Sequence, residues 1–186
     1  MESYRVDKDS LGEVKVPSNA YYGPFTVRAS NQYKVTGQKP HVNMIKAFAM
    51  IKRSAALANK NLSVLPAVKA DAIVKACDEI LCGQLLDQFI VDSINSGAGT
   101  AFNMNINEVI ANKALEVTGH RIGDYSFINP NDDVNMSQSS NDTFPTAMHI
   151  ALLMNVKEVV ESLDSLVTSL ERKAQEFKDV IKIGRT

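Results

Sequence analysis

Apolar side chains recur at alternating intervals of four and three residues near the end of the chain, in a segment running from Pro145 to Ile181. The apolar positions are Leu152, Val156, Val159, Leu163, Leu166 and Leu170, with Phe177 and Val180 resuming the phase. Such a heptad seam is typical of a helix that faces partner helices. At 1.5 Å per residue the predicted helix spans roughly 55 Å, more than the core of a small domain. We therefore expect the chain to be the front part of a larger helical protein, ending at Thr186 just where another element should begin.

Shorter apolar stripes predict two helices upstream. The first starts after Pro40, and its stripe carries Ile45, Phe48, Ile51 and Leu57. Its charged residues, Lys46, Lys52 and Arg53, mostly fall off this stripe, as is typical of an amphipathic helix. The second helix opens near Pro66 and stops at Gly83, because glycine is typical of the residue that follows a helix.

A third helix is predicted from Gly99-Thr100 to Gly119, and Gly119 is expected to end it in the left-handed conformation. Its interior carries four asparagines, Asn103, Asn105, Asn107 and Asn112. Asparagine is a poor residue for a helix interior because its side chain competes for backbone hydrogen-bonding groups. We therefore expect these amides to satisfy buried partners or to contact a ligand.

The remaining segments show little periodicity. Residues 1–40 are predicted to be irregular with short extended pieces, because turn-forming residues recur there. Residues 85–91 could form either helix or strand. Residues 120–142 resemble an ordered loop long enough to suspect function. A domain boundary is expected near Asn141, where the loop gives way to the long helix.

Composition narrows the class of partner. Of the 186 residues 45% are apolar and 22% charged, and the formal net charge is -1. This balance attracts neither nucleic acid nor an anionic membrane, so small molecules or other subunits are the expected partners. The two cysteines, Cys77 and Cys82, are predicted to be reduced, largely buried thiols. The N-terminus lacks the apolar core of a signal peptide and no run reaches membrane-span length, so a cytoplasmic protein is expected.

Small polar residues open two of the predicted helices. They are Ser96–Thr100 before the Asn-rich helix and Ser139–Thr143 before the long one, with Pro145 suited to the first turn of the latter. A helix N-terminus presents N–H donors and a partial positive charge, and nearby hydroxyl and amide groups add donors, so both sites suit an anion such as a pair of carboxylates. The alternative is that Thr100 and Asp142 or Thr143 are simple N-caps.

Other cofactor and metal chemistries find no support. No glycine-rich loop is followed by the Lys-Ser or Lys-Thr pair of a P-loop, and Gly97-Ala98-Gly99 alone is too common to indicate dinucleotide binding. His41, His120 and His149 are far apart and lack metal-ligand spacing. We expect no metal and no cofactor.

Short motifs in collinear order cover nearly the whole chain. They are Leu11-Gly12-Glu13, Ala20–Gly23, Ser54–Asn59, Gly97–Thr100, Asn103-Met104-Asn105, Asn107–Asn112, Pro130-Asn131-Asp132, Ser137–Asp142 and Gly184-Arg185-Thr186. Together they resemble the aspartase/fumarase superfamily of lyases. The resemblance implies a mainly α fold: an N-terminal helical domain with short extended segments, residues 1–140, then the start of a central helical bundle, residues 141–186. It also implies a homotetramer whose active sites combine residues from three subunits.

Members of this superfamily eliminate ammonia or water from a dicarboxylate or amino-dicarboxylate through an aci-carboxylate intermediate. By motif, the substrate-binding positions match Thr100, Ser139, Ser140, Asn141 and Thr186. The first three would hold the carboxylate that becomes a dianion, and the last two would orient the leaving group and the other carboxylate. In the family a histidine follows Gly-Arg-Thr and the general base lies far downstream. No catalytic base is therefore assigned here, it is expected beyond Thr186, and the 186 residues alone are expected to be inactive.

Two branches of the superfamily are compatible with these motifs. Gly97–Thr100, Tyr21-Tyr22-Gly23 and Asn129–Asp132 are similar to aspartases, whereas Ser139–His149 is closer to class II fumarases; Phe102 and Asp133 depart from both. The resemblance favours elimination of ammonia from L-aspartate to give fumarate. The alternatives are a class II fumarase, or a non-enzymatic helical oligomerisation or binding module.

Overall fold

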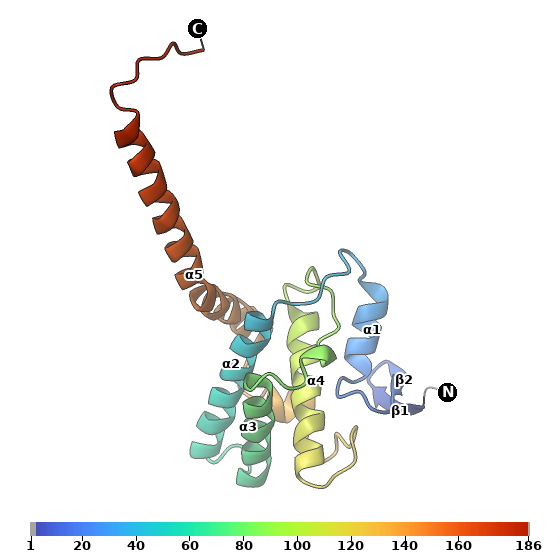
Figure 1. Cartoon of the computed structure of the whole chain (residues 1–186). Coiled ribbons are helices and arrows are strands. Elements are labelled where there is room, and N and C mark those ends of the chain that lie inside the picture. Colours follow the sequence, from blue (N-terminus) through green and yellow to red (C-terminus); the bar gives the residue numbers. More distant parts are fainter. Residues whose placement is uncertain (1–2, 186) are drawn as a thin grey trace. The chain divides into compact units, whose positions relative to one another are not determined.

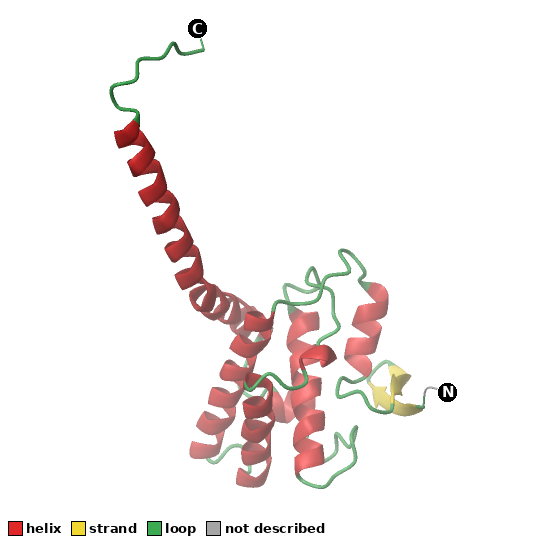
Figure 2. Ribbon diagram, in the orientation of Figure 1, coloured by secondary structure: helices red, strands yellow, loops and turns green. Residues whose placement is uncertain are grey.

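Residues 3–185 are described by a computed structural model, and most of them are helical (Figures 1 and 2). They divide into two compact units, Met1–Ala151 and Leu152–Thr186. The mainly α architecture predicted from the sequence is confirmed. The division into functional domains at residues 1–140 and 141–186 stays a prediction. No helix in the described part of the chain is both long and apolar enough to cross a membrane.

The N-terminal segment is more regular than predicted. Strands β1 (Tyr4–Asp9) and β2 (Gly12–Pro17) form an antiparallel hairpin in which Tyr4 pairs with Pro17. Helix α1 (Pro24–Gln32) follows, with proline at its start, where a missing N–H costs nothing. The prediction that residues 1–40 are irregular is therefore wrong for α1, while the expected short extended pieces are present.

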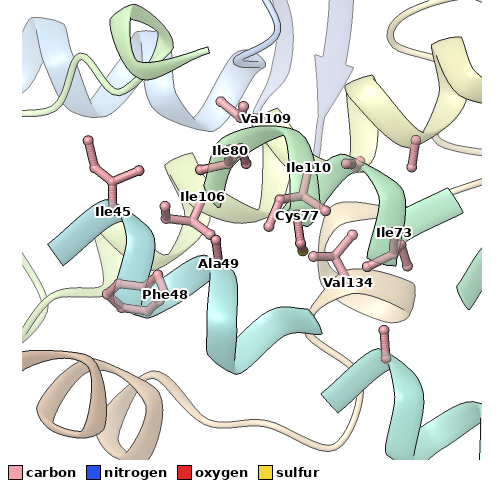
Figure 3. Packing of buried hydrophobic residues seen from close by; sticks show 14 of the residues in the cluster. Ile45, Phe48, Ala49, Ile73, Cys77, Ile80, Ile106, Val109, Ile110 and Val134 are labelled. Carbon is pink, nitrogen blue, oxygen red and sulfur yellow. The ribbon is translucent and has the colours of Figure 1, made fainter. Parts of the chain in front are cut away.

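Three helices form the core of the first unit. They are α2 (Val42–Asn61), α3 (Ala67–Leu81) and α4 (Thr100–Val117), close to the three predicted segments. Figure 3 shows Phe48 of α2, Ile80 of α3 and Ile106 of α4 in this core, all fully buried. Burying each such side chain stabilises the fold by roughly 1.5–3 kcal/mol. The glycines expected to end α3 and α4 have φ of 92° and 77°, values that favour glycine.

Irregular segments connect these helices. Residues 85–91 are neither a full helix nor a strand, since only a short 3-10 turn, η1 (Leu86–Gln88), forms there. The predicted loop after α4 contains a short π-helix, η2 (Pro130–Val134). Cys77 is buried as predicted. Cys82 is exposed, contrary to prediction, because it occupies the end of α3; both are free thiols.

Helix α5 (Ser140–Glu176) begins and ends earlier than predicted. Pro145 lies inside the helix instead of in its first turn, so the backbone bond to the Asn141 carbonyl cannot form. In the second unit the heptad side chains from Leu152 to Leu170 are 48–64% exposed. Phe177 and Val180 are similarly exposed but lie beyond the helix end, so they do not continue the seam. Within the second unit the described residues form no other helix that could cover this seam.

Candidate functional site

The starts of α4 and α5 lie side by side in the first unit. Gly99 precedes α4 with φ of 93°, and a side-chain carbon at this position would collide with the Phe144 ring of α5. In the first turn of α4, Asn103 Nδ2 donates to Ser140 Oγ at the start of α5, over 2.8 Å. The glycine allows close approach of the two elements, and the hydrogen bond ties them together. Both polar helix starts therefore belong to one site.

The backbone N–H groups at the start of α4 already have partners. Thr100 N donates to Gly97 O at 3.1 Å, and Phe102 N donates to Asn95 Oδ1 at 3.3 Å. Gly99, and not Thr100, occupies the N-cap position. The alternative that Thr100 caps this helix is therefore wrong. The expectation of unpaired backbone donors fails at these two positions, because the preceding loop folds back over them.

The start of α5 is capped one residue before the helix. Ser139 Oγ accepts a hydrogen bond from Asn141 N at 3.2 Å, and Ser139 O accepts one from Thr143 N at 2.9 Å. The first bond satisfies a donor that the first helical turn leaves without an intrahelical partner, and the second is the first regular bond of the helix. The cap is Ser139, so the alternative that Asp142 or Thr143 serves as a simple N-cap is wrong.

The three hydroxyl groups at this site are not equivalent. Ser139 Oγ and Ser140 Oγ each accept a hydrogen bond, from Asn141 N and Asn103 Nδ2, so their own protons are available to an anion. Thr100 Oγ1 lies 2.7 Å from Gly97 O, and because a carbonyl oxygen can only accept, the Thr100 proton is already used. In this arrangement the serines are the donors ready for a ligand.

Backbone strain is present in both loops. Ala98 has φ of 51° and Ser137 has φ of 62°, a region that non-glycine residues adopt only at a cost. Strained residues of this kind persist where the surrounding structure holds them, and they cluster at functional sites. Ala98 lies two residues before Thr100, and Ser137 two residues before Ser139. Because Ser63 and Leu85, outside these loops, have similar φ of 59° and 61°, the strain by itself does not mark the candidate donors.

A buried polar network lies beneath the serines. Lys52 Nζ of α2 donates to Asn135 Oδ1 at 2.8 Å, and the side-chain amides of Asn103 and Asn107 donate to the same oxygen at 3.1 and 3.3 Å. Asn135 Nδ2 in turn donates to Gln138 O at 3.1 Å, just before the serines. Lys52 is fully buried, which the amphipathic pattern of its helix did not indicate. Burial lowers the pKa of Lys52 to about 7.

The other two helix asparagines have structural partners. Asn105 joins α4 to the preceding segment by accepting from Ile90 N at 3.1 Å and donating to Gln88 O at 3.2 Å. Asn112 donates to Tyr21 O at 2.7 Å. All four asparagines are buried. As predicted, all four side-chain amide nitrogens donate hydrogen bonds within the fold, but Oδ1 of Asn103 and Asn107 has no partner in the described part of the chain.

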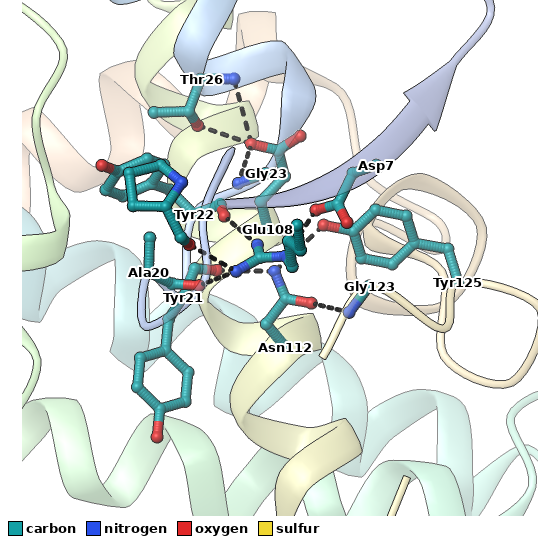
Figure 4. Close-up of polar contacts among 12 residues, drawn as sticks. Asp7, Ala20, Tyr21, Tyr22, Gly23, Thr26, Glu108, Asn112, Gly123 and Tyr125 are labelled. Carbon is teal, nitrogen blue, oxygen red and sulfur yellow. Dashed lines mark hydrogen bonds and ion pairs between the residues drawn. The ribbon is translucent and has the colours of Figure 1, made fainter. Parts of the chain in front are cut away.

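Glu108 is the buried carboxylate on α4, and its bonds fix the start of α1 (Figure 4). It accepts hydrogen bonds from Gly23 N at 2.9 Å, Phe25 N at 2.9 Å and the Thr26 hydroxyl at 2.6 Å. Burial raises the pKa of Glu108, and these donated bonds oppose the shift. Both oxygens are occupied, so Glu108 serves the fold and is not poised to take a proton from a ligand.

The electrostatics of the site suit an anion. The N-termini of α4 and α5 each contribute a partial positive charge, and Lys52 lies below them. Asp142, in the first turn of α5 and exposed, partly offsets this potential. Among residues 3–185 no group of three or more His, Cys, Asp or Glu side chains is placed to hold a metal ion.

The structure brings four predicted substrate-binding residues, Thr100, Ser139, Ser140 and Asn141, to the adjoining helix starts. Thr186, the fifth, lies outside the described residues. The roles assigned to all five stay predictions. Lys52 and Asn135 were missed, because an isolated lysine or loop asparagine carries no local signal of burial. The i, i+4 spacing of Asn103 and Asn107 was a signal that could have indicated their shared partner.

Comparison with known proteins identifies the family to which the chain is similar. A family model described as lyase matches residues 12–186. The aspartate ammonia-lyase of Bacillus subtilis (strain 168) is 51% identical over 185 residues, covering 100% of this chain and 39% of that protein. The class II fumarate hydratase of the same organism is 48% identical over 184 residues, covering 98% of this chain and 40% of that protein. The crystal structure of fumarate lyase:delta crystallin from Brucella melitensis in native form superposes with a TM-score of 0.89 at 49% identity, covering 99% of this chain and 43% of that one. The chain thus spans about two fifths of the length of these relatives.

Proposed function

The chain belongs to the lyase family, and we propose that the whole protein eliminates ammonia from L-aspartate to give fumarate. In this reaction a base removes a proton from the carbon next to one carboxylate. The electron pair moves onto that carboxylate to form an aci-carboxylate dianion. The return of this electron pair forms the carbon–carbon double bond as the carbon–nitrogen bond breaks and ammonia leaves. The second carboxylate takes no part in these bond changes. None of the proposed substrate-binding residues serves as this base.

The Asn103–Ser140 hydrogen bond is the observation that carries this proposal. It holds Ser140 Oγ as an acceptor, 2.8 Å from the amide nitrogen, and so leaves the hydroxyl proton to donate to a ligand. Ser139 is held in the same way by Asn141 N. Preorganised donors stabilise an oxygen most when its negative charge grows during the reaction. Ser139 and Ser140 therefore bind the carboxylate that becomes the dianion, with Thr100 and Asn141 beside them and Thr186 as a further substrate contact.

The substrate is tested by following fumarate absorbance with the whole protein and either L-aspartate or L-malate. Release of fumarate and ammonia from L-aspartate, at a kcat/KM well above that for L-malate, is the expected result. The reverse preference would refute the ammonia-lyase assignment and establish a fumarase. Turnover of neither substrate would refute both and favour a non-enzymatic binding module.

A class II fumarase is the second candidate. Its support is the 48% identity to a fumarate hydratase, close to the 51% for the aspartate ammonia-lyase, together with the fumarase-like run from Ser139 to His149. The same serine donors suit either reaction, because both form a dianion on a carboxylate and differ in the leaving group. The assay above separates them.

We further propose that the whole protein is a homotetramer assembled through α5. The seam side chains Leu163 and Leu166 are 53% and 54% exposed, although they belong to a regular apolar stripe. Exposed apolar strips of this length are association sites, and a heptad pattern fits a helix of another subunit. Sedimentation equilibrium of the whole protein tests this, and a monomer at micromolar concentration would refute it.

A further inference from the structure

We propose that Lys52 and Asn103 are positioning residues that hold the Ser140 hydroxyl as a hydrogen-bond donor toward the developing dianion; this inference rests on the proposed lyase function. Neither residue needs to touch the substrate. Lys52 acts through Asn135, and Asn103 joins Asn135 to Ser140. The chain of contacts runs from α2, through the loop before α5, to the serine hydroxyl.

The first support is the direction of each hydrogen bond. Asn135 Nδ2 donates to Gln138 O, so Asn135 Oδ1 faces Lys52 Nζ and accepts its hydrogen bond at 2.8 Å. The Asn103 amide is shared, donating to Asn135 Oδ1 at 3.1 Å and to Ser140 Oγ at 2.8 Å. Ser140 therefore receives a proton from below and keeps its own for the open side. If Asn103 presented an acceptor instead, the Ser140 hydroxyl would turn inward.

The second support is the burial of Lys52 without a counter-ion. Its side chain is fully buried, and no carboxylate of the described residues forms an ion pair with it at 4.0 Å or less. The titratable group that faces it from α3 is Cys77, a buried thiol whose pKa is raised and which is therefore neutral. A buried cation that lacks an anion is costly for the fold. A bound dianion above Ser140 would supply the missing negative charge.

The third support is that the network is not saturated. Asn103 Oδ1, Asn107 Oδ1 and Gln138 Oε1 are buried without a hydrogen-bond partner in the described part of the chain. Meanwhile three donors converge on the single oxygen of Asn135. Most buried polar atoms in native proteins have a hydrogen-bond partner, so each exception calls for an explanation. These three unpaired acceptors allow the bonds of the network to rearrange when charge appears at Ser140.

The test uses the whole protein with Lys52→Met and Asn103→Asp. Methionine has a volume similar to that of lysine but removes the donor and the charge. Aspartate at position 103 keeps the shape of the amide but replaces its donor by an acceptor for the Ser140 proton. Lys60→Met is the matched control, because Lys60 lies on the same helix and forms a surface ion pair with Asp71.

Two inhibitors separate positioning from folding. Succinate reproduces the two carboxylates of the ground state. The nitronate of 3-nitropropionate has a planar carbon and more negative oxygens, like the dianion. Both variants are expected to lower kcat by at least about tenfold and to weaken nitronate binding by a similar factor, while succinate binding changes less than about threefold. Lys60→Met is expected to match the wild type in kcat, nitronate binding and succinate binding.

Other outcomes refute the inference. Equal weakening of succinate and nitronate would show that Lys52 and Asn103 only maintain the fold, as would normal kcat in the folded variants. If Lys52→Met does not fold, the loss of nitronate binding relative to succinate binding in Asn103→Asp decides the question. Wild-type protein that turns over neither L-aspartate nor L-malate would refute the proposed function, and the inference with it. Wild-type turnover with unchanged variants would refute the inference alone.

Discussion

Replacing Gly99 by alanine should separate the two helix starts that form the site. The new Cβ would lie 2.5 Å from Phe144 Cε2 and nearer still to Cδ2 and Cγ of the same ring. Carbon atoms pack at about 3.5 Å or more, so the loop and the ring must move apart by at least about 1 Å. The Phe144 ring also packs against Phe48, with the ring centres 6.0 Å apart, so displacing the ring disturbs this contact as well.

Two costs add in Gly99→Ala. The φ of 93° disfavours alanine by about 1–2 kcal/mol, and relief of the collision adds about 1–3 kcal/mol. Gly83→Ala is the matched control, since its φ is 92° but a Cβ there would meet nothing within 4 Å. The difference in unfolding free energy between the two variants therefore measures the collision alone.

The functional effect should be larger than the effect on stability. Displacing Thr100 from Ser140 by about 1 Å is expected to lower kcat/KM of the whole protein by about 10²-fold, whereas Gly83→Ala should leave it unchanged. Adding Phe144→Ala to Gly99→Ala removes the obstructing ring, so the two changes should show a favourable coupling in a double-mutant cycle. Equal kcat/KM values for Gly99→Ala and Gly83→Ala, or strictly additive effects in the cycle, would refute the reasoning.

Three further predictions concern the donors, the seam and the buried lysine. Ser140→Ala should lower kcat/KM by about 10²-fold while changing stability by no more than about 1–2 kcal/mol. Thr100→Ala should cost less activity, because the Thr100 hydroxyl proton already bonds Gly97 O. Steady-state kinetics and urea unfolding check both variants, and an activity loss matched by general unfolding would contradict these predictions. Leu163→Glu with Leu166→Glu should shift the 186-residue chain toward monomer in sedimentation, and a wild-type chain that is a stable monomer at tens of micromolar would contradict this. Because the pKa of Lys52 is about 7 when folded and about 10.4 when unfolded, the unfolded state binds more protons between these values and stability should rise with pH. From pH 7 to 9 the unfolding free energy should increase by roughly 2–3 kcal/mol relative to Lys52→Met, and parallel pH curves would contradict the burial argument.

The contrast between α1 and the helices of the core shows where sequence reasoning reaches its limit. For α2, α3 and α4 the apolar stripe and the ending glycine lie within the segment itself, so local sequence predicted them. Helix α1 has only nine residues, and the first donors of its backbone bond Glu108, 82 residues away from Thr26. A cap that comes from another helix leaves no local signal.

The prediction of where α5 begins was wrong for a related reason. Pro145 favoured a helix beginning at that residue, because proline is common in the first turn. The structure starts the helix at Ser140 instead, with Ser139 as the cap and Asn103 of α4 bonded to Ser140. Tertiary contacts thus stabilise an additional turn that the local preference of proline did not indicate.

From sequence alone, the helical class, the asparagine-rich helix, the heptad seam and the polar helix starts could be identified, because periodicity and capping residues act over a few neighbouring positions. The motifs that resemble the lyase family also named Thr100, Ser139, Ser140 and Asn141 as candidates. Only the tertiary structure placed these residues together, through the contact between Gly99 and Phe144 and the bond between Asn103 and Ser140. It also buried Lys52 beneath them. Which hydroxyl can donate, and which is already occupied, depends on partners distant in sequence, and no local pattern encodes such partners.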